Sequence, residues 1–181
     1  MSYLLDKKAS EVLINKQGPG RLYYRLALDY VPQNLSLKPI DQGFAVTRDY
    51  SPVDAKSDVQ KDSDGIWHFK SGSTVRVKVH LESLGVRYHV AMADPIAAGA
   101  EPINTALLGG RADIPIQDVS DSQYWYRPWY EHHNLRDHQA EAFSSLLPAG
   151  AYDFTYTIQA STPGRYTVPP VKVEEMYMSE T

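Results

Sequence analysis

The sequence predicts an all-β protein, an antiparallel Greek-key β-sandwich with room for one short helix. Several segments alternate apolar and polar side chains with a period of two, which is typical of strands that bury one face. Turn sequences that contain Gly and Pro separate these segments. The 181 residues also include 13 Tyr and 3 Trp, residue types that favour strands over helices.

Three segments carry the strongest alternation. In Thr74–Ser83, three valines and Leu81 point to one face while polar side chains point to the other. Arg21–Tyr30 and Ala151–Gln159 alternate in the same way. Weaker patterns predict four more strands, at Phe44–Tyr50, Ile66–Phe69, Tyr88–Ala93 and Gln123–His132.

Two turn sequences connect further strands. Gly18-Pro19-Gly20 separates Glu11–Lys16 from Arg21–Tyr30 and predicts a hairpin. Pro163-Gly164 suits the central positions of a type II turn, because Pro presets φ and Gly accepts a positive φ. This turn is expected to lead into a strand at Arg165–Val168.

Three other regions have less regular patterns. Ser51–Gly65 and Ala106–Ser122 are rich in polar residues or Gly and are predicted to be loops. A short helix is one interpretation of Asp137–Ser145. The other is a strand with three small side chains on one face, Ala140, Ala142 and Ser144.

One local motif indicates how the strands connect. Leu147-Pro148-Ala149-Gly150-Ala151-Tyr152 has the spacing of a tyrosine corner. In this motif, a Tyr near the start of a strand returns its hydroxyl to a backbone group a few residues upstream and closes a Greek-key arch. Tyr152 is therefore the candidate corner residue, and it favours a Greek-key sandwich.

Charge and composition exclude several classes of function. The net charge is −4 and Lys and Arg are scattered, so the basic patch that nucleic-acid binding needs is missing. No apolar run approaches the roughly 20 residues of a membrane span. The absence of Cys excludes disulfides, thiolate metal sites and a Cys nucleophile. We interpret residues 1–10, which lack the apolar core of a secretory signal, as a linker or a tag remnant, and residues 11–181 as one domain.

Three histidines in the second half of the chain are the candidate metal ligands. His132 and His133 are adjacent, so on a strand they face opposite sides and cannot both reach one ion. On a helix, His133 and His138 are five residues apart, which misses the usual spacing of four. We therefore expect no metal site and no cofactor.

The sequence also lacks the motifs of an enzyme. Ser144 and Ser145 have no G-x-S-x-G elbow around them, and the carboxylates lie mainly in loops, with no sign of the pair that a glycosidase needs. We therefore expect no catalytic residues. Trp125, Trp129 and Tyr130 leave one alternative function open, a free-standing sugar-binding β-sandwich; a degraded hydrolase ranks third. The interpretation that we favour for these aromatic residues is sandwich core plus an interface.

Seven short runs, taken in order, carry a family resemblance that covers most of residues 11–177. They are Gly20-Arg21-Leu22-Tyr23-Tyr24-Arg25-Leu26, Gly43-Phe44-Ala45-Val46-Thr47-Arg48, Asp94-Pro95-Ile96-Ala97-Ala98-Gly99, Tyr130-Glu131-His132-His133-Asn134-Leu135-Arg136-Asp137, Leu147–Tyr152, Thr162-Pro163-Gly164, and Val168-Pro169-Pro170 through Glu174-Glu175-Met176-Tyr177. In this order they resemble the C-terminal domain of bacterial alpha-2-macroglobulins, which is a macroglobulin or immunoglobulin-like sandwich. Ser51–Gly65, Ala106–Ser122 and the final Met178–Thr181 depart from the family pattern.

The resemblance implies a non-catalytic role in a much larger protease inhibitor. In this family a protease cuts a bait region, the molecule rearranges, and an internal Cys–Gln thioester of another domain becomes exposed and bonds to the protease. The implied partners are the thioester domain and the other macroglobulin domains of the same polypeptide, with target proteases met only indirectly. The implied location is the periplasm, with the parent protein anchored at the inner membrane and no membrane contact by this domain.

The resemblance also implies which residues shield the thioester. The family places a Met-Tyr pair over it, and this pair corresponds to Met176 and Tyr177. A thioester survives in water only where attacking groups are kept away, and Met and Tyr supply adaptable apolar surface for that purpose. The alternative is that Met176 and Tyr177 are core residues that finish the last strand.

Overall fold

The computed structural model describes residues 14–27, 39–103 and 128–178. Contacts divide the chain into two units, residues 1–33 and residues 34–181. Within the described ranges, no helix is long and apolar enough to cross a membrane. The domain boundary predicted at residue 10 and the loop predicted at Ala106–Ser122 lie outside these ranges.

The described part of the first unit, residues 14–27, has no regular secondary structure. The strands predicted at Glu11–Lys16 and Arg21–Tyr30 are therefore wrong where the structure describes them. Leu22 and Leu26, which carry the apolar side of the predicted alternation, are exposed. A two-stranded hairpin is marginally stable unless other strands or a helix cover its apolar face, and residues 14–27 contain no such cover.

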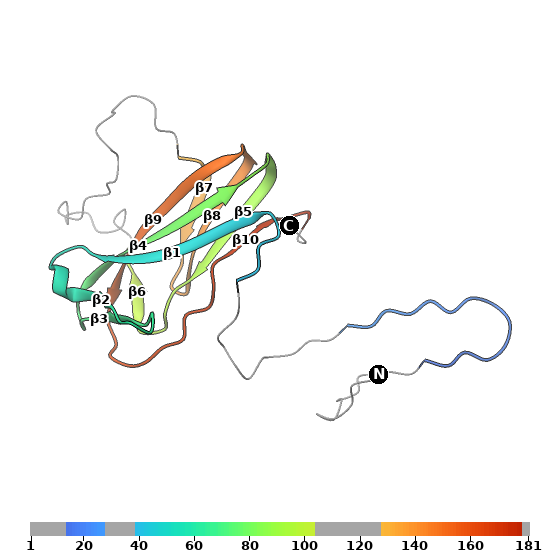
Figure 1. Cartoon of the computed structure of the whole chain (residues 1–181), viewed down its shortest axis with the longest axis horizontal. Coiled ribbons are helices and arrows are strands. Elements are labelled where there is room, and N and C mark those ends of the chain that lie inside the picture. The colour runs from blue at the N-terminus through green and yellow to red at the C-terminus, as the bar shows by residue number, and fades with distance from the viewer. Residues whose placement is uncertain (1–13, 28–38, 104–127, 179–181) are drawn as a thin grey trace. The chain divides into compact units, whose positions relative to one another are not determined.

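Two four-stranded antiparallel sheets form a sandwich in the second unit (Figure 1). In order across the first sheet, the strands are β1 (Phe44–Pro52), β4 (Thr74–Ser83), β9 (Gly150–Ala160) and β6 (Ala100–Pro102). In order across the second, they are β10 (Lys172–Glu175), β5 (Arg87–Pro95), β8 (Gln139–Leu147) and β7 (His132–Leu135). A short 3-10 helix, η1 (Lys56–Asp58), precedes a small two-stranded sheet of β2 (Val59–Lys61) and β3 (Trp67–Phe69).

The chain crosses between the two layers at the β4–β5 and β8–β9 turns. Strands β4 and β5 follow each other in sequence but lie in different sheets, and so do β8 and β9. Strand β4 is held between β1 and β9, with Val77 opposite both Tyr50 and Tyr156. Strand β5 is held between β10 and β8. This arrangement is the antiparallel Greek-key sandwich that the sequence predicts.

The core lies between the inner faces of the two sheets. From the first sheet it receives Val75, Val77, Val79, Leu81, Phe154, Tyr156 and Ile158, and from the second Val90, Met92, Ala140, Ala142 and Leu147. The four apolar positions of Thr74–Ser83 are all buried, so the period-2 pattern marks the buried face correctly. Removing this apolar surface from water is the main stabilising contribution to the sandwich.

Five predicted strands are confirmed by the structure. Thr74–Ser83 forms β4 with the predicted bounds, and the other four correspond to β1, β3, β5 and β9 with ends that shift by one to two residues. Asp137–Ser145 contributes to strand β8 and forms no helix. The helix is wrong because Ala140, Ala142 and Ser144 alternate into the core while the strand pairs with β5.

Three other expectations need correction. The loop predicted at Ser51–Gly65 contains the end of β1, η1 and the short strand β2. The strand predicted at Gln123–His132 is wrong for residues 128–131, which form no strand, because β7 begins only at His132. Residues 123–127 lie outside the described ranges. No strand forms at Arg165–Val168, and the last strand is β10 instead.

The chain around Pro163-Gly164 does not form the predicted type II turn. Gly164 does not have the positive φ that this turn requires at its third residue. Its small size serves a close approach instead, since a Cβ there would lie 2.8 Å from the hydroxyl oxygen of Tyr166. The same ring lies against Gly99, where a Cβ would be 2.2 Å from ring carbon Cε2. The local conformation of this segment therefore follows from the close packing of the Tyr166 ring against Gly99 and Gly164.

Candidate functional site

Met176 and Tyr177 occupy a tight turn directly after β10. The amide of Met178 donates to the carbonyl oxygen of Glu175 over 3.0 Å, so the two residues are the central pair of a four-residue turn. Met176 is 47% exposed and Tyr177 is 82% exposed. The interpretation of these residues as core is therefore wrong, and we call residues 175–178 the Met-Tyr turn.

The second sheet anchors the Met-Tyr turn through strand β5. Glu175 lies opposite Val90 in the antiparallel pairing, and the amide of Met176 donates to the carbonyl oxygen of His89 over 2.9 Å. The buried carboxylate of Glu175 accepts two further hydrogen bonds, from the amide of Tyr88 at 2.7 Å and from Nη1 of Arg87 at 3.4 Å. Four neighbouring residues of one strand thus hold the base of the turn.

Other apolar side chains are exposed at the same end of the sandwich. The pairings of Ser83 with Gly150 and of Arg87 with Leu147 bring the β4–β5 and β8–β9 turns together here, next to the end of β10. Ten large apolar side chains are exposed in the described part of the second unit, and seven of them lie at this end. We call these seven the apolar end: Leu84, Val86, Tyr88, Leu146, Met176, Tyr177 and Met178.

Tyr152 lies near the start of β9, just after the β8–β9 turn and beside the apolar end. Its hydroxyl donates to the carbonyl oxygen of Pro148, four residues upstream, over 2.8 Å. The ring faces Trp129 at a centroid distance of 6.2 Å. The hydrogen bond from Tyr152 to Pro148 closes the turn that leads from the second sheet back to the first.

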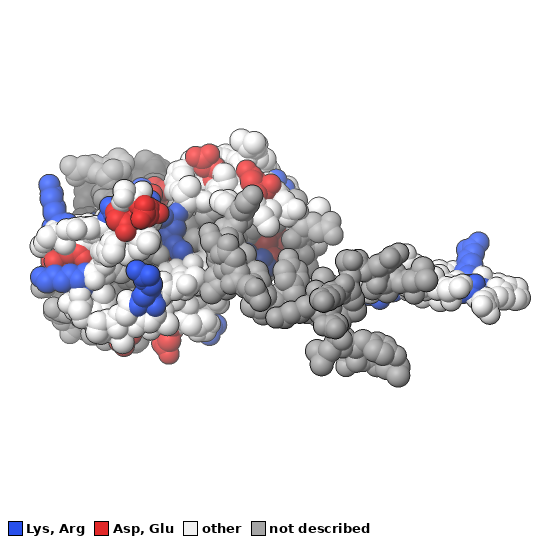
Figure 2. Space-filling view, turned by 60° about the horizontal axis from the view of Figure 1, so that its bottom comes forward, with Lys and Arg blue, Asp and Glu red and all other residues white. Residues whose placement is uncertain are grey.

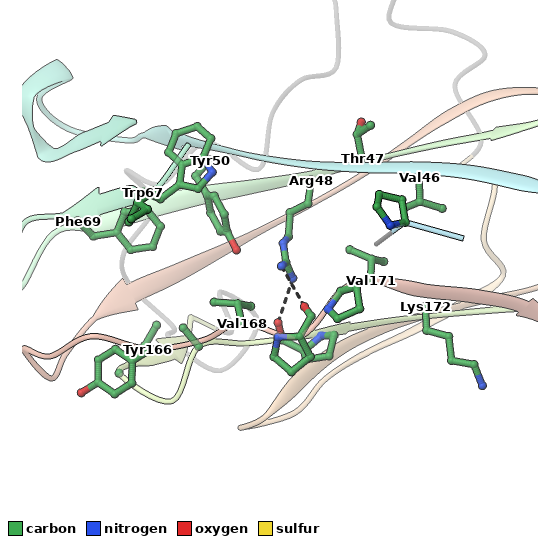
Figure 3. Close-up of a pocket in the computed structure, with 18 of the residues that line it drawn as sticks. Val46, Thr47, Arg48, Tyr50, Trp67, Phe69, Tyr166, Val168, Val171 and Lys172 are labelled. Atoms are coloured by element: carbon green, nitrogen blue, oxygen red, sulfur yellow. Dashed lines mark hydrogen bonds between the residues drawn. The ribbon is translucent and has the colours of Figure 1, made fainter. Parts of the chain in front are cut away.

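A groove of about 1760 Å³ is the second candidate site (Figure 3). Its walls come from β1, from the β2–β3 hairpin and from the segment that leads into β10. Most of the side chains that line it are apolar or aromatic, and those labelled in the close-up include Val46, Tyr50, Trp67, Phe69, Val168 and Val171. The groove therefore offers a mostly apolar surface with polar side chains among its lining residues.

Arg48 is one of the charged residues that line this groove. Its Nη1 contacts the carboxylate of Asp94, which is 0% exposed, and its Nη2 donates to the carbonyl oxygen of Pro169 over 3.0 Å. The hydroxyl of Tyr156 donates to the other oxygen of Asp94 over 2.8 Å. These bonds connect both sheets and the segment before β10, so we interpret the cluster as a structural ion pair.

The electrostatics of the cluster follow from its burial. Loss of solvent raises the pKa of Asp94, while the Arg48 guanidinium and the Tyr156 hydroxyl act in the opposite direction. Burial also raises the pKa of Tyr50 to about 12 and raises that of Tyr156, with the Asp94 charge adding to the effect. Both tyrosines are therefore neutral at physiological pH, and the Tyr156 hydroxyl is available as the donor to Asp94.

The candidate metal ligands do not converge. His132 contacts Asn134 and stacks on Phe143, whereas the His133 ring packs edge-on against Tyr130. Within residues 14–27, 39–103 and 128–178, no three His, Cys, Asp or Glu side chains are grouped closely enough to hold a metal ion.

Trp129 is engaged by its own domain. Its indole N–H donates to the carbonyl oxygen of Asp153 over 3.0 Å, and its ring meets Tyr130 edge-on at 5.6 Å. A sugar platform needs an open aromatic face, so Trp129 gives that alternative no support. Trp125 lies outside the described residues.

Charged side chains are dispersed on the face that Figure 2 shows. Lys and Arg lie singly or next to Asp and Glu and form no broad basic area there. The contacts of His80 in β4 and its neighbours show the same mixing of charges, because its ring contacts Asp153 at 2.7 Å and Glu82 at 3.1 Å, while Lys78 contacts Asp153 at 2.9 Å. Hydrogen bonds to the two carboxylates raise the pKa of His80. This face does not present the surface that binds a nucleic-acid backbone.

The sequence reasoning missed two parts of these sites. The Arg48–Asp94 pair joins residues 46 positions apart, and the sequence signal for it is that both belong to runs that carry the family resemblance. His89 was missed because it lies inside the alternating pattern of a strand, where nothing marks a special backbone conformation.

Comparisons with known proteins agree with this architecture. The family model described as "Bacterial Alpha-2-macroglobulin MG10 domain" matches residues 43–180. The chain is 32% identical over 169 residues to "Circularly permutated Ras protein 2" of Dictyostelium discoideum, and 26% identical over 183 residues to "Alpha-2-macroglobulin homolog" of a Nostoc strain. These alignments cover 93% and 97% of this chain but only 4% and 9% of the relatives, so the chain spans less than a tenth of their length.

Solved structures share the fold. The Escherichia coli alpha-2-macroglobulin activated by porcine elastase matches with a TM-score of 0.64 and 24% identity, over 82% of this chain and 13% of that one. A second structure of the E. coli protein, in its native form and spanning domain MG7 to the C-terminus, matches with a TM-score of 0.55 and 22% identity, over 81% and 22%. With the family match covering most of its length, the chain belongs to the bacterial alpha-2-macroglobulin MG10 domain family.

Proposed function

We propose that this domain is a non-catalytic part of a multidomain protease trap, in which the Met-Tyr turn covers the internal thioester of a neighbouring domain. The observation that carries the proposal is the turn itself, because it presents Met176 and Tyr177 outward while strand β5 anchors its base. The MG10 family match and the resemblance of the closing Glu-Glu-Met-Tyr run support the assignment.

The chemistry of a thioester explains why such a cover is needed. Water and amines attack its carbonyl carbon, and an apolar cover that excludes them slows the reaction. Each 1.4 kcal/mol added to the barrier slows attack about tenfold. Met176 has a flexible, polarisable side chain that conforms to an irregular surface, and Tyr177 adds a large ring. Both are exposed here and thus available to bury against a partner.

The apolar end supports packing on a neighbouring domain. Seven large apolar side chains gathered at one end form the kind of surface that marks a protein contact, whereas scattered single apolar residues carry no such meaning. We therefore assign the apolar end to the interface with the thioester domain and with other macroglobulin domains of the same polypeptide. Target proteases meet this domain only indirectly.

We place the parent protein in the periplasm, at the inner membrane. The small share of the relatives that the chain covers supports a long parent. An antibody raised against the 20.4 kDa chain should detect a band several-fold larger in a periplasmic extract. A native band of the size of the chain, or a band confined to the cytosol, would contradict this part of the proposal.

Substitutions in the thioester-bearing parent test the shielding role. Tyr177→Ala and Met176→Ala are expected to increase the rate at which the thioester reacts with methylamine, by about tenfold for the loss of each 1.4 kcal/mol of barrier. Release of the free Cys thiol measures the reaction. Tyr177→Phe, which keeps the ring, should stay near the parental rate.

A matched control separates shielding from general loss of apolar surface. Ile66 is 48% exposed, close to the value for Met176, but precedes β3 in the small two-stranded sheet, away from the Met-Tyr turn. Ile66→Ala is therefore expected to leave the methylamine rate unchanged. Parental rates for both Tyr177→Ala and Met176→Ala would remove the shielding role.

A further inference from the structure

We propose that His89 is a positioning residue that sets the orientation of Tyr177 in the Met-Tyr turn. This inference rests on the proposed shielding function for its consequence, but its structural part can be tested independently. It combines three features of His89: its backbone conformation, the hydrogen bond of its carbonyl group and the contact of its ring.

The backbone of His89 is in the left-handed region, with a φ of 53°. It is the only residue other than glycine with a positive φ among those that the structure describes. A Cβ makes this conformation unfavourable, and such residues concentrate at sites where the strain serves a function. The residues on either side keep the same register with β8, Tyr88 opposite Leu146 and Val90 opposite Ser144, so the conformation does not accommodate an inserted residue.

The conformation directs backbone groups of β5 toward the Met-Tyr turn. The regular pairing with β10 ends at Val90 and Glu175. Beyond that point, the carbonyl oxygen of His89 accepts the amide of Met176 at 2.9 Å, and the amide of Tyr88 donates to the Glu175 carboxylate at 2.7 Å. The first exposed residue of the turn is therefore fixed by His89.

The imidazole ring then meets the ring of Tyr177. Their centroids are 5.2 Å apart and their planes cross at 89°, an edge-to-face arrangement within the range that aromatic pairs prefer. Tyr177 is 82% exposed, so its own domain covers little of it, and the imidazole is the ring that it contacts. The contact reduces the set of orientations that the exposed tyrosine adopts before a partner covers it, which lowers the entropy lost on docking.

Two variants separate the ring of His89 from its backbone conformation. Asn tolerates the left-handed region, so His89→Asn keeps the backbone and removes the ring. His89→Phe keeps an aromatic edge against Tyr177 but tolerates the left-handed region less well, so protection of the Met176 amide must also persist in this variant. In NMR spectra of the 181-residue chain, we expect wild type and His89→Phe to show nuclear Overhauser effects between the two rings, and His89→Asn to lose the ring-current shift of Tyr177. Protection of the Met176 amide from hydrogen exchange should persist in His89→Asn.

The same variants in the thioester-bearing parent test the consequence. His89→Asn is expected to raise the methylamine rate by about two- to tenfold, the range that corresponds to one aromatic pair, and His89→Phe to stay near the parental rate. In a Tyr177→Ala background, His89→Asn should add nothing, because the ring through which it acts is gone. A residue needed only for folding would add its effect in both backgrounds.

The outcomes distinguish the inference from the proposed function. Equal acceleration by His89→Asn with and without Tyr177, or unchanged Tyr177 ring signals in His89→Asn, would overturn the positioning role. If the NMR contact is present and lost as expected but Tyr177→Ala reacts at the parental rate, the positioning of the ring stands and the shielding function fails.

Discussion

Removing Arg48 from the buried ion pair should be among the most damaging single substitutions in the sandwich. Arg48→Met eliminates the contact with Asp94 and the hydrogen bond to Pro169, and it leaves a carboxylate that is 0% exposed without its counter-charge. Breaking a buried pair from one side costs about 3–5 kcal/mol, and for a chain of this length each kcal/mol lowers the midpoint of thermal unfolding by about 2–4 °C. We therefore expect a loss of about 6–20 °C.

A double variant shows whether the loss comes from the unpaired charge. Arg48→Met combined with Asp94→Leu removes both charges and leaves apolar side chains in their place. Such replacements are often close to neutral, but here the hydroxyl of Tyr156 loses its acceptor, which costs about 1–3 kcal/mol. The double variant should therefore be more stable than Arg48→Met alone. Urea unfolding followed by tryptophan fluorescence at pH 7 measures both free energies of unfolding.

The pH dependence gives a second check with a definite sign. The pKa of Asp94 is already raised by burial, and loss of Arg48 raises it further. Between the unfolded and folded pKa values, the folded state keeps a proton that the unfolded state has released, so stability falls as the pH rises through this window. The deficit of Arg48→Met should thus shrink as the pH is lowered from 7 toward 4. A deficit below about 1 kcal/mol at pH 7, or one that grows on acidification, would refute the reasoning.

Three further substitutions test other parts of the structure. Tyr152→Phe removes the hydroxyl that donates to a backbone carbonyl and should lower the free energy of unfolding by about 1 kcal/mol in urea titrations. Gly99→Ala forces a Cβ to within 2.2 Å of a tyrosine ring and should cost about 1–3 kcal/mol, whereas Gly85→Ala, with no atom within 4 Å of the new Cβ, should stay within about 0.5 kcal/mol of wild type. An NMR titration of His80 should give a midpoint above the ordinary 6.5, and Asp153→Asn should lower it. Because the folded pKa is the higher one, the stabilisation from this contact is fully present below pH 6.5 and is lost as the pH rises through the folded midpoint.

The sequence predicts well those strands whose apolar side chains pack against a second layer. In β4 the apolar positions all reach the core, and Phe154, Tyr156 and Ile158 of β9 do the same from the neighbouring position in the sheet. Residues 21–27 have an equally regular pattern, but the described part of their unit, residues 14–27, contains no second layer, and they form no strand. A periodic pattern therefore predicts which face is apolar, but strand formation also needs something to cover that face.

The short edge strands and the ion pair depend on tertiary context. Strands β6 and β10 have three and four residues with no clear apolar–polar alternation, and they form because β9 and β5 supply pairing partners. The Arg48–Asp94 contact is set by the packing of the two sheets. Likewise, the position of Met176 and Tyr177 came from the family resemblance alone, since a local pattern does not tell a turn from the end of a strand.

In the Met-Tyr turn, the groups that hold the turn in place differ from the side chains that it presents to a partner. The bonds that hold it use main-chain atoms of Met176 and Met178 and the Glu175 side chain, whereas the two central side chains contribute little to the interior. Substitution at the central positions should therefore be tolerated by the scaffold almost regardless of residue type. An engineer can therefore replace the pair with other residues, such as one that carries a fluorescent probe or a reactive handle, while the sandwich stays unchanged.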